Sequence, residues 1–421
     1  MRARLFYFAF VLVLAGLASA GCAGRGHSSS SLKHPPGNEV ITLSARVEHL
    51  DTLVREPMLV EHPRGTLFVS GYNRRGPALW RSTDRGATWT RIDVGGAAEG
   101  AIGNSDVDLA VARDGTLYFV AMSYDRHRAQ PIGTQISIGV SLDQGESWHW
   151  TTLSHRLGDD RPWVAVTPDG NAHVIWNDGH GVNHAVSHDR GSSWTRMGRV
   201  SDRGGSSHLA IGPKGEIAVR VGPGSASGNG CDKDADFVVV SVDGGATWHP
   251  HAAPGNPRPS GCLAENPPIP RWVDPVAWDS AGALYTLWTT ETGVWLARSE
   301  NQGATWATLR VAAAAPDTAF FPYLTARSPG ILAATWFTFA GDSLHWRVAR
   351  IDMRSGARSP RIAASAAMAL ESWAGNPPRT DPGGEYLPVA LLADGSVAVV
   401  TPIQHEAVHR LGFAWWRFIV H

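Results

Sequence analysis

Polar side chains stand at the start of seven similar segments of the chain, where they could act together. Each segment opens with charged, hydroxyl or phenol side chains and continues into apolar residues typical of a β-strand. Arginine forks bind carboxylates through two parallel, charge-assisted hydrogen bonds. A tyrosine can act as a nucleophile if a neighbouring base takes its proton, because a phenol with a pKa of about 10 otherwise keeps it at neutral pH. The opening residues are Arg55 and Glu56, Asp106 and Asp108, Asp160 and Arg161, Ser206 and Ser207, Arg271 and Asp274, Tyr323, and Glu385 and Tyr386.

The segments that must position these residues belong to a repeat. An eight-residue pattern consists of Ser, any residue, Asp or Asn, any residue, Gly, any residue, Ser or Thr, and Trp. The Asp or Asn positions are 46 to 59 residues apart, a period that predicts one sheet per unit. Each copy is predicted to form a hairpin turn, because the Asp or Asn accepts backbone hydrogen bonds and the Gly supplies a positive φ. The five copies are 82–89, 141–148, 187–194, 241–248 and 299–306.

Paired apolar strands recur seven times and predict seven blades. A turn containing Gly separates the two strands of each pair. The last unit ends one strand short of four at His421, and the alternating segment 40–47 is predicted to complete it and close the ring. The predicted fold is therefore an all-β propeller of seven blades. Six blades are the alternative if one unit is an inserted hairpin, and 363–373 is the one stretch expected to be helical.

The eight-residue pattern resembles the Asp-box of the sialidase-like β-propellers, where these boxes lie on the outer rim and serve structure. Segment 55–75 is similar to the opening segment of sialidases, which has an Arg-Ile-Pro motif, an apolar strand, Gly-Thr-Leu and a further Arg. The resemblance implies that Arg55 and Arg220, with Arg161 or Arg271, bind a carboxylate, that Arg74 matches the trailing Arg, and that Tyr386 matches the nucleophilic tyrosine.

The chain also departs from the sialidase pattern. Glu56 replaces the Ile of the motif, segment 73–77 lacks the acid/base Asp, and segment 206–208 lacks the Glu that polarises the tyrosine. Glu385 or Glu56 could replace that base, and another carboxylate could replace the acid. The candidate catalytic residues are Tyr386, Glu385, Glu56, Asp106 and Asp160, and the candidate ligand-binding residues are Arg55, Arg74, Arg161, Arg220 and Arg271.

Two function classes follow from this pattern. The chain is either a carbohydrate-active enzyme, such as a glycoside hydrolase of exo-sialidase-like type or a polysaccharide lyase, or a non-catalytic propeller that binds a polysaccharide or an envelope protein. No cofactor is implied. The run His180, His184 and His188 does not predict a metal site, because residues four apart on a strand are about 13 Å apart. The net charge of −1 and the 18% of charged residues argue against a nucleic-acid partner.

The N-terminal sequence predicts export. Segment 1–21 has two arginines, a short apolar stretch and small residues before Cys22, and segment 22–38 reads as a flexible tether to a propeller at 39–421. We expect a bacterial lipoprotein anchored to the membrane through lipid on Cys22; cleavage after Ala20 and secretion is the alternative, which membrane fractionation of Cys22→Ala distinguishes. Cys231 and Cys262 are an even pair suited to a disulfide in an oxidising compartment, or else are two separate thiols.

Overall fold

The computed structural model describes residues 39–73, 75–129, 131–222, 235–255, 274–290, 293–313, 318–340, 343–354, 360–370, 384–405 and 410–421. The predicted signal segment and tether lie outside these ranges, and so do five residues singled out above: Cys22, Arg74, Cys231, Cys262 and Arg271. Within the described residues, no helix has the length and apolarity that a membrane span requires.

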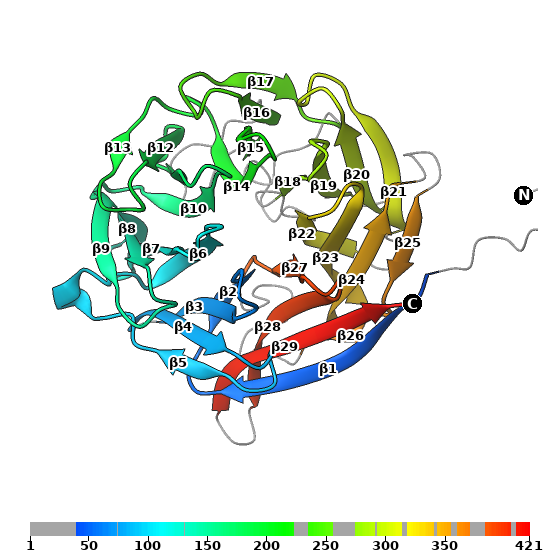
Figure 1. Ribbon diagram of the computed structural model, residues 1–421, viewed down its shortest axis with the longest axis horizontal. Helices are drawn as coiled ribbons and strands as arrows, with labels where there is room; N and C mark the ends of the chain where they lie inside the picture. The colour runs from blue at the N-terminus through cyan, green and yellow to red at the C-terminus, as the bar shows by residue number, and fades with distance from the viewer. Residues whose placement is uncertain are drawn as a thin grey trace, which may run out of the picture. The chain divides into compact units, whose positions relative to one another are not determined.

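The described strands form seven antiparallel sheets arranged as blades around a centre (Figure 1). Blade 1 contains β2 (Arg55–Glu61), β3 (Leu67–Asn73), β4 (Gly76–Ser82) and β5 (Thr90–Ile92). Blade 2 contains β6 (Ser105–Val111), β7 (Leu117–Asp125), β8 (Ile132–Ser141) and β9 (His149–Ser154). Blade 3 contains β10 (Asp160–Val166), β11 (Ala172–Asn177), β12 (Val182–Ser187) and β13 (Thr195–Arg196). A short 3-10 helix, η1 (Ala97–Glu99), precedes blade 2.

The remaining four blades follow the same plan. Blade 4 contains β14 (Gly205–Ile211), β15 (Ile217–Gly222), β16 (Phe237–Ser241) and β17 (His249–Ala252). Blade 5 contains β18 (Val276–Trp278), β19 (Leu284–Thr290), β20 (Gly293–Ser299) and β21 (Ala307–Ala313). Blade 6 contains β22 (Thr318–Ala326), β23 (Ile331–Ala340), β24 (Ser343–Asp352) and β25 (Arg361–Ala364), and β26 (Met368–Ala369) also pairs with β24. Blade 7 contains β27 (Val389–Leu391), β28 (Val397–His405), β29 (Arg410–Val420) and β1 (Ile41–Leu50).

Blade 7 is built from both ends of the described chain. Strand β1 pairs antiparallel with β29, from Ile41 opposite Val420 to Leu50 opposite Gly412. Beyond the strands, the backbone N–H of His421 donates to the carbonyl oxygen of Val40 at 3.0 Å. This pairing gives β29 a partner on its outer side, so its edge is not left exposed.

The expected helix at 363–373 is wrong for its described part, which forms β25 and β26. Alanine-rich sequence favours helix locally. In the fold, however, β24 offers an unpaired edge, and its Ala349 pairs with Ala364 while its Trp346 pairs with Met368. Edge pairing satisfies the backbone and outweighs the local preference.

The five eight-residue repeats form turns with a shared set of hydrogen bonds. In the third copy, the Ser187 hydroxyl donates to Asp189 at 2.8 Å and accepts from the backbone N–H of Gly191 at 2.8 Å. The backbone N–H of Ser193 donates to the Asp189 carboxylate at 2.8 Å. Hydrogen bonds from the Ser193 side chain and backbone lower the pKa of Asp189 to about 2. Gly191 has φ +82°, and a Cβ there would lie 2.5 Å from the Val140 side chain of blade 2.

We expect Ser187→Ala to lower the free energy of unfolding by about 1–3 kcal/mol, because it leaves the buried N–H of Gly191 without its acceptor. Denaturant unfolding monitored by tryptophan fluorescence measures the change. Ser192→Ala in the same turn is the matched control, because Ser192 is exposed and its loss should stay within about 0.5 kcal/mol. Equal stability of Ser187→Ala and wild type contradicts the role assigned to the turn.

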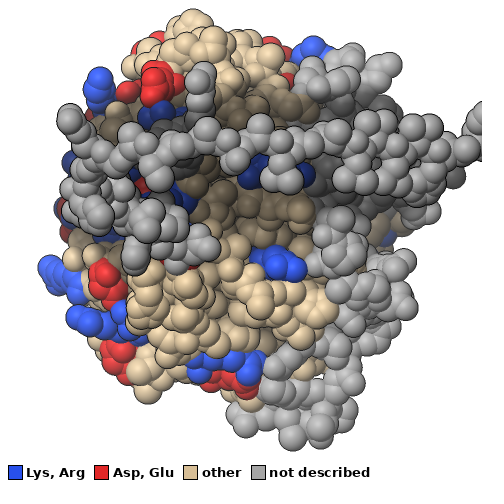
Figure 2. All heavy atoms as spheres, turned by 90° about the vertical axis from the view of Figure 1, so that its right-hand side faces the viewer, with Lys and Arg blue, Asp and Glu red and all other residues tan. Residues whose placement is uncertain are grey.

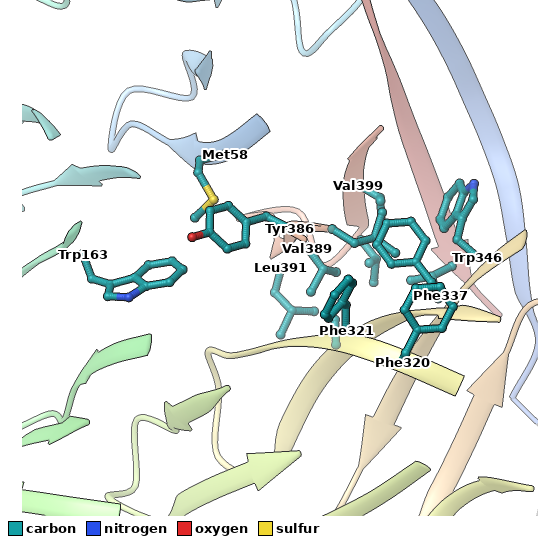
Figure 3. Close-up of a cluster of buried hydrophobic side chains, with 14 of the residues drawn as sticks. Met58, Trp163, Phe320, Phe321, Phe337, Trp346, Tyr386, Val389, Leu391 and Val399 are labelled. Atoms are coloured by element: carbon teal, nitrogen blue, oxygen red, sulfur yellow. The ribbon is translucent and has the colours of Figure 1, made fainter. Parts of the chain in front are cut away.

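Aromatic side chains pack the blades against one another. Trp80 of blade 1 meets Phe413 of blade 7 with ring centroids 5.2 Å apart, and Trp346 of blade 6 meets Trp416 of blade 7 at 5.1 Å. One buried cluster extends from Trp163 and Met58 near the centre to the space between blades 6 and 7 (Figure 3). On the side of the molecule in Figure 2, described basic and acidic side chains lie near one another, and most of the described surface is neither. The aromatic packing therefore holds the blades, and with them the inner strands, in place around the centre of the ring.

Candidate functional site

Five of the residues predicted to be functional lie together at the start of the inner strands. The Tyr386 hydroxyl donates a hydrogen bond to Asp106 Oδ2 at 3.0 Å. The carboxyl group of Glu56 interacts electrostatically with Asp106. Its Oε1 accepts a hydrogen bond from the backbone N–H of Glu385 at 3.3 Å, whereas its buried Oε2 has no hydrogen-bond partner within the described structure. Arg161 Nη2 lies 2.9 Å from Glu385 Oε2. We call these five residues the Tyr386 cluster; they come from blades 1, 2 and 3 and from the segment leading into β27.

Backbone bulges place two members of the cluster. Glu56 has φ +45° and Arg161 has φ +49°, and a proline follows each of them. The strand register shifts between Arg55 and Met58 and between Asp160 and Trp163. A non-glycine residue at positive φ costs about 1–3 kcal/mol, and such residues persist only where the surrounding structure holds them. The bulges therefore mark the strand positions where backbone strain is retained and a charged side chain is directed into the cluster.

A glycine brings the seventh blade onto this site. Gly384 has φ +120°, a conformation that residues with a side chain rarely adopt. A Cβ on Gly384 would lie only 2.1 Å from Glu56 Cγ. Only glycine therefore lets the segment that carries Glu385 and Tyr386 lie directly on Glu56.

Burial and the neighbouring carboxylates set the protonation of the cluster. Burial, followed by the charges of Asp106 and Glu385, holds the pKa of Glu56 well above its usual range, which favours its protonated form. Burial, followed by Asp106 and Glu56, likewise raises the pKa of Tyr386, while Arg161 acts against this shift. Burial disfavours the charge of Arg161, but Glu385 and Asp160 outweigh it and its pKa lies above the usual value. The cluster thus places three carboxyl groups and one guanidinium around the phenol.

Two further predicted residues lie next to the cluster. Arg55 Nε is 3.5 Å from the hydroxyl of Tyr72, and the Arg55 charge acts against the rise in the pKa of Glu56. Asp160 is buried and interacts electrostatically with Arg161. Both residues therefore affect the charge balance around the Tyr386 cluster.

Arg220 and Asp108 make other contacts. Arg220 is buried and forms ion pairs with Asp236 and, at 3.5 Å, with Asp274. Asp108 accepts backbone hydrogen bonds from Leu109 at 2.8 Å and Val164 at 2.9 Å, so it ties β6 to β10. Burial raises the pKa of Asp108 to about 7, although both hydrogen bonds act to lower it. Asp108 therefore links blade 2 to blade 3 through hydrogen bonds.

Sequence reasoning missed an aromatic layer one step further along the inner strands. The Trp163 ring lies 5.1 Å from the ring of Tyr386 and 4.5 Å from that of His208, which it stacks against. Tyr323 meets His208 edge-on at 4.6 Å. Figure 3 shows Trp163 and Met58 near the hydroxyl end of the Tyr386 ring. Trp163 follows Arg161 by two residues, and this spacing on a strand was the available signal.

A cavity of about 550 Å³ lies along the later part of the inner strands. Its lining includes Trp163, His208 and Trp278. The indole nitrogens of the two tryptophans and both ring nitrogens of His208 are buried and have no hydrogen-bond partner within the described structure. Burial, followed by the charge of Arg161, lowers the pKa of His208 to about 3, so its ring is neutral. Trp163 separates this cavity from Tyr386.

The histidine run does not gather around one point. His184 Nε2 lies 3.0 Å from Nδ1 of the buried His173, while the ring of His188 contacts Asn171 at 2.9 Å. Among the residues that the structure describes, no group of three or more His, Cys, Asp or Glu is placed to hold a metal ion.

Comparisons with known proteins address the fold. No protein-family model matches the chain, and neither does any curated protein sequence. A xyloglucanase of family GH74 from Xanthomonas campestris superposes with a TM-score of 0.54 at 16% identity, over 88% of this chain and 55% of that one. A fungal alcohol oxidase of the AA5 family, in complex with copper, gives 0.54 at 14% identity, over 90% and 76%. The chain is a seven-bladed β-propeller. The predicted likeness to sialidase-like propellers is confirmed at this level of architecture.

A sialidase is also among the similar structures. The Hadza microbial sialidase Hz136 has a TM-score of 0.47 and 16% identity over 67% of this chain, which spans 63% of the sialidase. Identities this low show the propeller fold alone, so the chemistry of this propeller has to be argued from its own residues.

Proposed function

We propose that this propeller hydrolyses a glycan at the Tyr386 cluster, as a retaining glycoside hydrolase with Tyr386 as nucleophile. The observation that carries the proposal is the 3.0 Å hydrogen bond from the Tyr386 hydroxyl to Asp106. A buried phenol is a poor nucleophile unless a base within hydrogen-bond reach takes its proton, and Asp106 is such a base. The sequence alone favoured Glu385 or Glu56 for this role.

The three side chains supply a balanced pair of steps. Tyr386 Oη bonds to the anomeric carbon as the glycosidic C–O bond breaks; Asp106 takes the phenol proton, and Glu56, whose raised pKa favours its protonated form, gives its proton to the departing oxygen. Water then attacks the anomeric carbon as its bond to Tyr386 Oη breaks; the water loses a proton to Glu56, and Asp106 returns its proton to Tyr386. Two carboxyl groups whose environments separate their protonation states are the usual basis of such acid and base roles.

Two observations support a glycan as the substrate class. The fold is shared with a xyloglucanase, although fold likeness by itself assigns no substrate. The partly exposed side chains of Asp106, Glu385 and Arg55 give the cluster a surface that hydroxyl groups can contact. The partly exposed polar groups at the start of the inner strands are therefore the place where we expect a glycan to bind.

A panel of fluorogenic glycosides tests the proposal. We expect turnover of at least one of them by wild type, and a loss of about 10²–10⁴-fold in kcat/KM for Asp106→Asn, because the amide cannot take the phenol proton. Asp108→Asn is the matched control on the same strand; it should lower the melting temperature and leave kcat/KM of the folded protein close to wild type. Turnover that is unaffected by Asp106→Asn contradicts the mechanism.

A non-catalytic glycan-binding propeller is the second candidate. The burial of the reacting groups favours it, since Tyr386 is only 2% exposed and Glu56 only 7%. In that case wild type turns over none of the glycosides, and wild type and Asp106→Asn bind the same glycan.

A further inference from the structure

The buried cation of the Tyr386 cluster is already paired with a carboxylate of this chain. Arg161 is 4% exposed, and its Nη2 lies 2.9 Å from Glu385 Oε2. Asp160 adds a second negative charge that interacts with Arg161. A substrate carboxylate that needed the Arg161 fork would have to displace Glu385 from it.

The charges around Tyr386 are also unfavourable to an incoming anion. The Asp106 carboxylate accepts from the Tyr386 hydroxyl, the Glu385 carboxylate pairs with Arg161, and Asp160 adds a negative charge that interacts with Arg161. The described cations near them are Arg161 and the half-buried Arg55, which lies beside Glu56. These groups leave no excess of positive charge among the described residues of the site, so an incoming carboxylate meets other negative charges there.

The other buried arginine predicted to bind a carboxylate follows the same rule. Arg220 is 3% exposed and is paired with Asp236 and Asp274. Each of these two arginines is thus neutralised by the chain itself.

We propose that the site selects uncharged sugars, and that Glu385 is the residue that excludes acidic sugars by occupying the Arg161 guanidinium. This inference rests on the proposed glycan-directed function and names its substrate class. The hydroxyl groups of a neutral sugar can donate hydrogen bonds to Asp106 and Glu385. A uronic or sialic acid instead brings a carboxylate, which cannot donate to these two carboxylates and is repelled by them. Removing the Glu385 charge should release Arg161 for a bidentate contact with a sugar carboxylate.

Matched sugar pairs test this selectivity. A fluorogenic glucoside and glucuronide differ only at C6, as do a galactoside and a galacturonide. We expect wild type to favour the neutral member of the pair it accepts by at least about 100-fold in kcat/KM, which is about 2.7 kcal/mol. In Glu385→Gln the ratio of kcat/KM for the neutral sugar to kcat/KM for the acidic sugar should fall at least about tenfold, because kcat/KM for the acidic sugar rises. The amide keeps a hydrogen-bond acceptor for Arg161 while removing the charge.

Glu61→Gln is the matched control for the substitution. Glu61 forms an ion pair of 2.9 Å with Arg327 at the far end of β2, and its loss should leave the ratio unchanged. A wild type that prefers the acidic member, or a Glu385→Gln variant with an unchanged ratio, overturns the inference. If Glu385→Gln does not fold, the wild-type ratio alone decides.

Binding separates failure of this inference from failure of the proposed hydrolase. Saturation-transfer NMR with methyl glucoside, methyl galactoside and their uronic acid counterparts reads the same preference without turnover. If the neutral sugars bind preferentially but none is hydrolysed, the proposed hydrolase activity is contradicted and the selectivity for uncharged sugars is supported. Binding of neither class overturns both.

Discussion

Tyr386→Phe is expected to abolish hydrolysis, with kcat/KM falling by at least about 10⁴-fold. The substitution removes only the oxygen that is proposed to attack the anomeric carbon, and loss of a nucleophile costs more than loss of any single supporting group. The ring that packs at 5.1 Å against Trp163 remains, so the melting temperature should stay close to that of wild type. Initial rates on the accepted fluorogenic glycoside measure the effect.

Tyr323→Phe is the matched control for this prediction. Tyr323 is another tyrosine on an inner strand, β22. Its hydroxyl contacts Met58 Sδ at 3.9 Å, not a carboxylate. Its removal should leave kcat/KM near wild type. A 2-fluoro glycoside of the accepted sugar should also add its sugar mass to the peptide that carries Tyr386. Labelling of a different residue, or equal rates for Tyr386→Phe and wild type, argues against Tyr386 as the nucleophile.

The buried His173–His184 pair is expected to make stability depend on pH. Burial lowers the pKa of His173 to about 4, and burial followed by the neighbouring His173 lowers that of His184 to about 3. In the unfolded chain both rings take up protons below a pKa of about 6.5. The unfolded state therefore binds more protons than the folded state between about pH 6.5 and pH 4, and the free energy of unfolding falls as the pH decreases. From pH 7 to pH 5 the pair should cost about 4 kcal/mol.

Two carboxyl groups act in the opposite direction over this range. The raised pKa of Glu56 and that of Asp108, at about 7, mean that the folded state holds protons which the unfolded state releases. Acidification relieves this cost, whereas the lowered pKa of His208, at about 3, adds a loss in the same direction as the pair, so the total change with pH differs from the contribution of the histidine pair. The difference between wild type and a variant without the pair isolates that contribution.

The double variant His173→Leu, His184→Leu provides this comparison. Denaturant unfolding at pH 7 and pH 5 should show wild type losing about 4 kcal/mol more than the variant on acidification. His180→Gln is the control, because His180 is exposed and its replacement should leave the wild-type difference intact. The same pH dependence in wild type and the double variant contradicts the role assigned to the buried pair.

The repeating parts of this protein can be read from its amino-acid sequence. The turns depend on hydrogen bonds between residues two to four apart, such as Ser187 to Asp189 and Gly191 to Ser187, so their pattern is visible in eight residues. Each strand pair is also local, because a tight turn separates its two strands. Seven blades could therefore be counted, and the polar residues that open the inner strands could be named.

Which of those polar residues lie together depends on how the blades pack. Tyr386 and Asp106 are 280 residues apart in the chain, and Arg161 and Glu385 are 224 apart. Nothing in the sequence gives the bulges that turn Glu56 and Arg161 toward Tyr386, or the carboxylates that neutralise Arg220. The Ala-rich segment that forms β25 and β26 is misread for the same reason. Local sequence encodes a turn or a strand through neighbouring atoms, whereas a site at the centre of a ring depends on the distances between blades, which exist only once the ring has closed.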